Sequence, residues 1–267
     1  MKKLAVFVAV LAVLVGSFYY SNTGFSVTEM TIQVGEEDTS LEGLQIVHVS
    51  DLHDATFGEE QVDLIDAVKQ KQPDLIFITG DLIDSNRYDL EQSLAAVRGF
   101  VDIAPIYYVT GNHEIATGQE NEIKSQLSQL GVTVLSNELT TISYQGQSIE
   151  ILGIEDPLSG TSVSDVLSLH PRSELPRLTL SHRPEVFEDY VAAGEQLVLS
   201  GHAHGGQLRL PGIGGLIAPG QGFFPTYTAG VYEEQGTQMV VSRGLGNSLF
   251  PYRIFNRPEV IFITLER

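Results

Sequence analysis

Metal-binding side chains follow five short apolar runs of the chain, in each case just after the run ends. The runs cover residues 44–49, 75–78, 106–109, 177–180 and 196–199. The side chains that follow them are, in chain order, Asp51, His53, Asp81, Asn112, His113, His182, His202 and His204. Imidazole together with hard oxygen, and without sulfur, suits Mn²⁺, Fe²⁺, Zn²⁺ or Ni²⁺ better than Ca²⁺ or Mg²⁺. The pattern therefore predicts a site for divalent metal.

The local spacing favours a common centre. Asp51 and His53 are two residues apart, and so are His202 and His204. At the end of a strand, side chains i and i+2 point to the same side, so each pair can converge. A glycine directly before Asp81, and before two other candidates, lets the backbone turn sharply there. Taken singly, Asp and Asn after a strand are usually turn residues; the ordered set of five strand ends is what indicates a site.

The elements that must position these residues alternate between strand and helix in the first half. Apolar residues recur at helical spacing over 60–71 and 88–100, between the apolar runs. Such alternation predicts βαβ units and a sheet buried on both faces, with ligands at the carboxyl ends of its strands. In the second half we expect further strands at 131–135, 148–152, 237–242 and 260–265 and a helix at 184–193.

A glycine-rich segment stands out in the second half. Residues 205–230 hold eight glycines and three prolines, which predicts a loop with little regular structure. Phe223 and Phe224 lie within it and could wall a pocket or fill the core; we expect the second.

The N-terminus has the pattern of an export signal. Two lysines precede an apolar run from Leu4 to Tyr20, which is at the short end of what spans a bilayer. The small-residue cleavage site is poor, so we expect an uncleaved anchor rather than secretion after signal cleavage. The paired lysines favour an N-terminus inside and the rest of the chain outside the cytoplasmic membrane. The expected organisation is an anchor or signal at 1–20, a stalk at 21–40 and one domain at 41–267.

Composition excludes several classes of protein. The chain has no cysteine, which rules out a disulfide scaffold, a thiol nucleophile and a Cys-ligated zinc site. Its net charge of −19 argues against nucleic acid as a partner, because the phosphate backbone would be repelled. Most of that charge lies before residue 172, and two divalent ions would make the predicted site itself locally positive.

The five blocks together resemble the calcineurin-like metallophosphoesterase superfamily, in its membrane-anchored or exported bacterial form. The resemblance rests on Asp-x-His, Gly-Asp, Gly-Asn-His-Glu, a lone His and Gly-His-x-His, in that order over residues 50–204. It implies an α/β fold, a double β-sandwich flanked by helices. It also implies one metal held by Asp51, His53, Asp81 and His204, and another held by Asp81, Asn112, His182 and His202. His113 would lie near the leaving-group oxygen without binding metal.

The implied activity is a dimetal phosphohydrolase in which a metal-bridging hydroxide attacks phosphorus. Mn²⁺ is the expected metal, with Zn²⁺ or Fe²⁺ as alternatives. Arg183 and Arg243 are candidates for substrate phosphate, although Arg243 could equally form a structural ion pair. The substrate class stays open among phosphorylated small molecules, lipid-linked pyrophosphates and cell-surface polymer phosphodiesters. A non-catalytic, membrane-tethered metal-binding scaffold is the alternative function.

Overall fold

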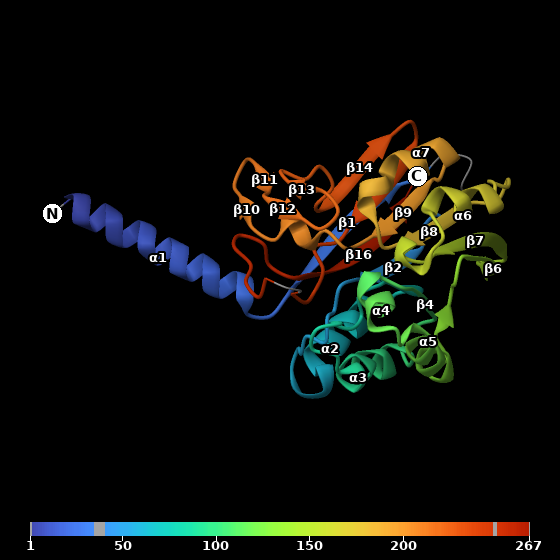
Figure 1. Ribbon diagram of the computed structural model, residues 1–267, viewed down its shortest axis with the longest axis horizontal. Coiled ribbons are helices and arrows are strands. Elements are labelled where there is room, and N and C mark those ends of the chain that lie inside the picture. The colour runs from blue at the N-terminus through green and yellow to red at the C-terminus, as the bar shows by residue number, and fades with distance from the viewer. Residues whose placement is uncertain (1, 35–40, 248–249, 267) are drawn as a thin grey trace.

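The computed structural model describes residues 2–34, 41–247 and 250–266. Two six-stranded sheets form the body of the protein, and one long helix extends from it (Figure 1). The first sheet has the strand order β1-β16-β2-β3-β4-β5, in which only the β16–β2 pair is antiparallel. Its strands are β1 (Ser26–Gln33), β2 (Gln45–Val49), β3 (Leu75–Thr79), β4 (Ile106–Val109), β5 (Thr133–Val134) and β16 (Glu259–Glu266).

The second sheet has the order β14-β15-β9-β8-β7-β6. Its four central strands are parallel, and the pair at each edge is antiparallel. Its strands are β6 (Glu138–Tyr144), β7 (Gln147–Ile154), β8 (Arg177–Ser181), β9 (Leu197–Ser200), β14 (Gly230–Glu234) and β15 (Thr237–Val241).

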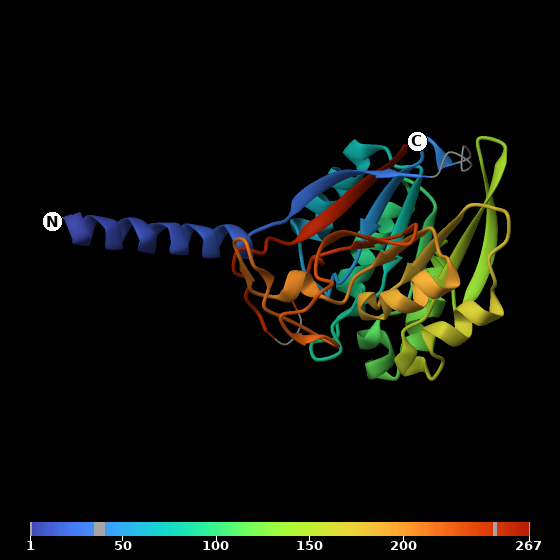
Figure 2. The same cartoon turned by 90° about the horizontal axis from the view of Figure 1, so that it is seen from above.

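The sheets pack face to face, with helices on both outer sides (Figure 2). The core between the sheets joins side chains such as Phe77 and Val109 of the first sheet to Leu180 and Leu199 of the second. The outer cores lie beneath α2 (Val62–Lys71), α3 (Leu90–Phe100) and α5 (Glu120–Gln129) on one side and α6 (Val163–Leu169) and α7 (Phe187–Ala193) on the other. This arrangement confirms the expected double sandwich flanked by helices.

The strands and helices predicted from hydrophobic spacing are present, with shifted ends. The helix expected at 60–71 begins with a short 3-10 turn, η2 (Glu59–Gln61), before α2. The helix expected at 184–193 likewise starts as η4 (Pro184–Val186). The sequence reading missed α5, α6, β6 and β14, whose half-exposed positions carry weaker periodicity, and the short α4 (Asn112–Thr117) and η3 (Pro157–Ser159).

The glycine-rich segment contains more structure than predicted. It begins with η5 (His204–Gly206) and forms two small hairpins made of β10 (Arg209–Leu210), β11 (Gly214–Gly215), β12 (Ile217–Ala218) and β13 (Gly222–Phe223). The expectation for its two phenylalanines is wrong: Phe223 is 78% exposed and Phe224 is 72% exposed. The hairpins are too short to cover their own side chains, so these rings point away from the core.

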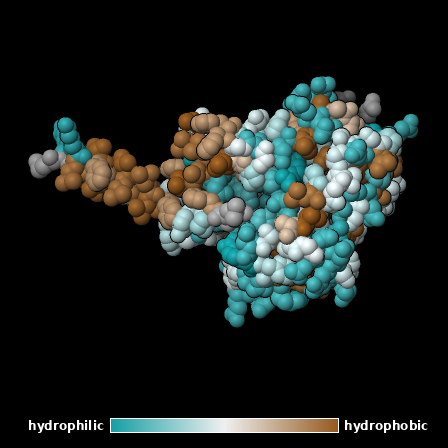
Figure 3. All heavy atoms as spheres, in the orientation of Figure 1, coloured by the Kyte–Doolittle hydropathy of each residue, from teal (hydrophilic) through white to brown (hydrophobic). Residues whose placement is uncertain are grey.

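The N-terminal helix α1 (Lys2–Asn22) stands clear of the body, and almost all of its apolar surface is exposed (Figure 3). With a mean hydropathy of 2.2, α1 is long and apolar enough to cross a membrane, a property that signal sequences share. The expected stalk, residues 21–40, contains the end of α1 and all of β1. Its residues 35–40 lie outside the described part of the chain, so the boundary near residue 40 stays a prediction.

Candidate metal centre

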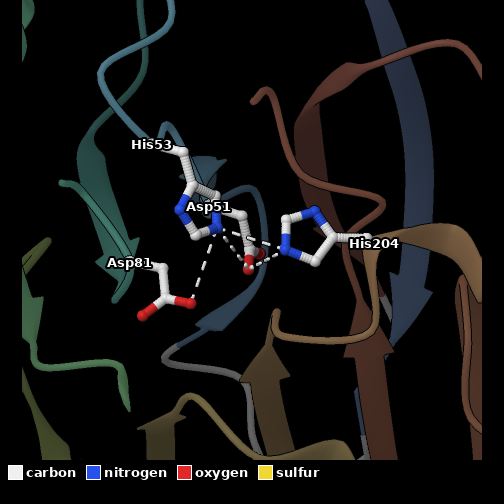
Figure 4. Close-up of side chains that lie close together, drawn as sticks. All are labelled: Asp51, His53, Asp81 and His204. Atoms are coloured by element: carbon white, nitrogen blue, oxygen red, sulfur yellow. Dashed lines mark hydrogen bonds and ion pairs between the residues drawn. The ribbon is translucent and has the colours of Figure 1, made fainter. Parts of the chain in front are cut away.

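Four side chains from three strand ends form the first cluster of potential ligands (Figure 4). Asp51 and His53 follow β2, Asp81 follows β3 and His204 follows β9. The Nε2 atom of His53 lies 3.1 Å from Nε2 of His204 and 3.6 Å from Oδ2 of Asp81. The Nε2 atom of His204 lies 3.5 Å from Oδ1 of Asp51. All four side chains are buried, so their donor atoms face one another rather than solvent.

A second cluster adjoins the first and uses the same carboxylate. Oδ2 of Asp81 lies 3.2 Å from Nε2 of His182, which follows β8. That nitrogen lies 3.2 Å from Nδ1 of His202 and 3.3 Å from Oδ1 of Asn112. The structure thus brings together all seven residues predicted as metal ligands, and Asp81 is the one that faces both clusters.

The backbone at the site is strained in a way that the spacing argument did not foresee. Asp51, His53, Asp81, His202 and His204 all have φ between 47° and 64°, the left-handed region that side chains other than glycine rarely adopt. Asp51 and His53 still converge on one cluster, as the i, i+2 spacing predicted.

His202 and His204 face different clusters, and the chain between them is not a strand, since His204 already begins the 3-10 turn η5. His204 joins the first cluster and His202 joins the second. The i, i+2 spacing thus does not bring this pair to one cluster, and the two histidines divide as the family resemblance implied.

Two glycines make the close approach of these loops possible. A Cβ atom on Gly111 would lie 2.2 Å from Oδ1 of Asp81, and one on Gly201 would lie 1.9 Å from Oγ of Ser50. Neither glycine has a positive φ, so the reason for glycine is space rather than conformation. Each keeps a carboxylate-bearing loop in contact with its neighbour across the edge of the sheets.

Burial and the attraction between His182 and its neighbouring carboxylates set the charges of the cluster. Burial opposes charge on His182, but Asp81 and Asp51 outweigh it and raise the pKa of that imidazole to about 10. Burial likewise favours a neutral Asp81, yet His182 lowers the pKa of that carboxyl well below its usual range. Asp51 lacks such close compensation, so burial raises its pKa to about 6. The carboxylates thus hold a positive charge between them.

The donor set fits divalent metal ions. Burial lowers the pKa of His53 to about 3 and drives the pKa of His202 and His204 well below the usual value, so these imidazoles are neutral. Nδ1 of His182 can donate to the carbonyl oxygen of Thr79 at 2.7 Å, which leaves Nε2 to face the cluster. Imidazole lone pairs and carboxylates that converge in a buried space require a cation to stabilise them.

His113 borders the first cluster without joining it. Its ring packs edge-on against that of His53, with 4.5 Å between ring centroids. The backbone N–H of Ser85 donates to Nδ1 of His113 at 3.0 Å. In that arrangement Nδ1 bears no proton, so the imidazole proton is on Nε2. The backbone N–H of His113 also donates to Oδ1 of Asp81 at 2.8 Å, which ties its position to the shared carboxylate.

Glu114 joins neighbouring loops of the site through backbone hydrogen bonds. Its carboxylate accepts backbone N–H bonds from Asp81 at 2.9 Å, Gly111 at 2.7 Å and Ile83 at 3.2 Å. It is fully buried, and burial together with the Asp81 charge raises its pKa to about 7. Glu114 therefore joins the loop after β3 to the loop after β4.

The two arginines predicted to contact phosphate lie in different surroundings. Arg183 lies beside the second cluster, with Nη1 2.9 Å from Nε2 of His202, and Asp156 holds its guanidinium through two hydrogen bonds. Arg243 pairs with Glu259, with Nη2 2.5 Å from Oε2. Of the two, Arg183 is the one whose guanidinium contacts a residue of the clusters.

Sequence reasoning missed three supporting residues. Asp156 fixes Arg183, Asn256 donates to the carbonyl oxygen of His204 at 2.7 Å, and fully buried Arg253 donates to the carbonyl oxygens of Arg243 and Gly246. Asp156 follows the apolar run of β7, so the same strand-end rule could have found it. Nothing in the local sequence marks Arg253 or Asn256, which come from an irregular loop.

Comparison with known proteins agrees with this geometry. A family model described as calcineurin-like phosphoesterase matches residues 44–206. Over 245 residues the chain is 31% identical to the uncharacterized metallophosphoesterase YkuE of Bacillus subtilis, covering 90% of this chain and 85% of the relative. Over 229 residues it is 31% identical to the phosphodiesterase YaeI of Escherichia coli, covering 83% and 82% of the two chains.

Among solved structures, the protein TT1561 of Thermus thermophilus superimposes with a TM-score of 0.51. The match covers 76% of this chain and 90% of that protein at 12% sequence identity, so it supports the fold alone.

Proposed function

The chain belongs to the calcineurin-like phosphoesterase family, and on that premise we propose that it is a dimetal phosphohydrolase held at the membrane surface that cleaves phosphodiester or pyrophosphate bonds. It is a metallophosphoesterase, and therefore a hydrolase that acts on ester bonds. One observation carries the dimetal proposal: five strand ends supply two clusters of donors that share Asp81.

The residues divide between two ions as the clusters do. One ion would be held by Asp51, His53, Asp81 and His204, and the other by Asp81, Asn112, His182 and His202. Two divalent ions there would neutralise phosphate oxygens and lower the pKa of a water molecule so that hydroxide is available at neutral pH. We propose Mn²⁺ as the first choice, with Zn²⁺ or Fe²⁺ as alternatives, since all three accept mixed imidazole and carboxylate ligands.

His113 is proposed as the group that assists the leaving oxygen. The N–H of Ser85 fixes the proton on Nε2, on the opposite side of the ring from the bonded Nδ1. From there Nε2–H can donate a hydrogen bond to the oxygen of the departing alkoxide or phosphate and stabilise its developing charge. Arg183 is the better-supported contact for a phosphate oxygen, because its guanidinium lies against His202 and is oriented by Asp156.

Membrane attachment through α1 is the second part of the proposal. The helix is apolar over its length, projects from the body and begins with two lysines. The lysines favour an N-terminus in the cytoplasm, which places the catalytic domain on the outer face of the membrane. Secretion after cleavage is the alternative outcome, and mass determination of the membrane-extracted protein distinguishes the two.

A phosphodiester is the first substrate to test, because the relative YaeI is named a phosphodiesterase. Full-length protein in detergent, stripped of metal and reloaded with Mn²⁺, Zn²⁺, Fe²⁺ or Mg²⁺, is assayed on bis(p-nitrophenyl) phosphate, p-nitrophenyl phosphate and a pyrophosphate ester. We expect turnover of the diester or the pyrophosphate with about two ions bound per chain, as a dimetal site requires. Folded, metal-loaded protein without turnover on any ester would contradict the enzyme proposal and favour the scaffold.

A further inference from the structure

Exposed apolar side chains gather at the end of the body next to α1. Among the described residues, twelve large apolar side chains outside α1 are exposed, and seven of them lie in the β10–β13 hairpins or the adjoining 250–252 loop. We call these seven the apolar face: Leu210, Ile213, Ile217, Phe223, Phe224, Phe250 and Tyr252. Figures 1 and 2 both place the hairpins at the end of the body from which α1 leaves, and Figure 3 shows apolar surface there.

Specific contacts join the apolar face to the end of α1. Phe18 of the helix packs against Tyr252, with 5.4 Å between ring centroids. The side chain of Asn22 donates to the carbonyl oxygen of Arg253 at 2.8 Å and accepts from its backbone N–H at 2.9 Å. The side chain of Gln207 in turn donates to the carbonyl oxygen of Phe250 at 2.8 Å. The helix therefore leaves the body at a defined place, beside the hairpins.

The charge pattern singles out the same surface. Residues 205–230 and 244–258 contain three arginines and not one Asp or Glu, although the chain carries 34 acidic residues. Cytoplasmic membranes carry anionic lipids, whose surface repels an acidic domain within a Debye length. These two segments are a part of the protein that can approach such a surface without repulsion.

A cavity at this end of the molecule reaches one residue of the first cluster, His53. It has a volume of about 460 Å³, and its walls include Ser21 and Asn22 at the end of α1, Arg87, Asn247 and the cluster residue His53. The guanidinium of Arg87 is oriented by Asp84, to whose Oδ2 its Nε donates at 2.8 Å. The lining combines polar groups with apolar side chains such as Phe57 and Leu245, and it includes the carboxylates of Asp54 and Asp89. Arg87 supplies the positive charge of this lining and could pair with the phosphate of a lipid headgroup.

We propose that the apolar face rests on the lipid bilayer that holds α1, and that the cavity takes the phosphoester headgroup of a lipid embedded in that bilayer. The proposal rests on the proposed function and narrows its substrate to a lipid-linked phosphoester. Aromatic rings at the level of the headgroups would anchor the face, as interfacial aromatic residues do in membrane proteins. The acyl chains would stay in the bilayer while the headgroup reaches His53.

Contact with the bilayer is tested without any assay of activity. The chain has no tryptophan, so Phe223→Trp in the full-length protein gives a single reporter on the apolar face. Leu169→Trp is the matched control, because Leu169 is 73% exposed on α6 at the far end of the body. In vesicles of phosphatidylcholine and phosphatidylglycerol, lipids brominated near the headgroup should quench the fluorescence of Phe223→Trp and leave Leu169→Trp unchanged. Equal fluorescence of the two reporters with and without bromine overturns the contact.

The substrate class is tested with paired variants and paired substrates. Phe223→Ser with Phe224→Ser removes two exposed rings, and Leu158→Ser with Leu169→Ser is the control of similar exposure. On a polyprenyl pyrophosphate or a phospholipid diester in vesicles, we expect the first double variant to lose about tenfold in kcat/KM, which corresponds to about 1.4 kcal/mol. On soluble bis(p-nitrophenyl) phosphate both double variants should match the unaltered chain.

The outcomes separate the two proposals. Turnover of the soluble diester without turnover of either vesicle-borne lipid contradicts the lipid substrate and leaves the phosphohydrolase intact. No turnover on any substrate contradicts the phosphohydrolase, while the tryptophan quenching still decides whether the face contacts lipid. Equal losses in both double variants on vesicles would show that the effect is not specific to the apolar face.

Discussion

The two sheets contribute different chemistry to one site. Loops after the first sheet supply both carboxylates of the clusters, the amide of Asn112, and the imidazoles of His53 and His113. Loops after the second sheet supply only imidazoles, those of His182, His202 and His204. The fixed negative charge therefore belongs to the first sheet, and the second sheet completes each cluster with groups that can become neutral. Neither sheet alone holds a full set of ligands.

The largest loss of activity is expected from a change at Asp81, the residue of the first sheet that both clusters share. Asp81→Asn removes the charge that faces both His53 and His182. We expect loss of both metals and a fall in activity of more than about 100-fold, beyond what loss of an outer-shell partner costs. Elemental analysis and diester hydrolysis measure this, with thermal unfolding as the check on folding. If Asp81→Asn still binds two ions, Asp81 does not bridge them.

One histidine from each sheet tests whether the clusters are separate. Of the two clusters, His53→Ala alters the first, where His53 also adjoins Asp84 and His113, and His202→Ala alters the second. We expect each variant to retain about one of the two ions of a dimetal site and to lose most activity. Metal titration by calorimetry, with the two variants side by side, should show the loss of a different site in each. If both variants lose the same site, the division into two clusters is wrong.

A variant of His113 tests whether this residue binds metal or assists the leaving group. His113→Ala removes a ring that packs beside His53 but belongs to neither proposed ligand set. We expect two ions to remain bound and kcat to fall by roughly 10²–10³, the usual cost of removing one hydrogen-bond donor that stabilises developing charge. A substrate with a better leaving group should recover part of the rate. Loss of metal from this variant would instead make His113 a ligand.

Away from the site, the second sheet buries a charged network around Arg177. Arg177 of β8 is fully buried and pairs with Glu150 at 2.8 Å and with Glu195 at 3.3 Å. Arg177→Ala leaves both carboxylates without their partner, so the free energy of unfolding should fall by about 3–5 kcal/mol. Arg98→Ala is the control, because its pair with Glu91 is exposed and is worth about 0.5 kcal/mol. Urea unfolding that gives equal losses for both would contradict the buried network.

The first sheet buries a neutral imidazole, that of His48 in β2. Burial lowers the pKa of His48 to about 3, and its Nε2 lies 2.7 Å from Oγ1 of Thr79. Its folded pKa lies below the unfolded value of about 6.5, so the unfolded chain takes up the proton first and stability falls as the pH drops below that value. Between about pH 6.5 and 5, the free energy of unfolding of His48→Gln should therefore fall by about 2 kcal/mol less than that of the unaltered chain. Equal acid sensitivity of the two proteins would mean that His48 is protonated in the folded state.

Much of the fold was predictable because its central strands are continuous apolar runs. Strands buried on both faces consist mainly of apolar residues, so β2, β3, β4, β8 and β9 are visible in the sequence. Edge elements such as β6 and β14 alternate between half-buried and exposed residues, which gives a weaker pattern. The exposure of Phe223 shows a second limit of the sequence, because an aromatic residue can be buried or exposed and its type alone does not decide which.

The sequence by itself determined which side chains meet. Five apolar runs end in ligand residues, and the carboxyl ends of parallel strands in packed sheets come to one edge, so their convergence follows from order and spacing. Only the tertiary structure decided how they meet. The turn after β9 sends the neighbouring imidazoles of His202 and His204 to different clusters, and Arg253 and Asn256 reach the site from a loop that no local pattern marks. The physical reason is that ligand type is a property of the residue, whereas direction and protonation depend on burial and on neighbours distant in the chain.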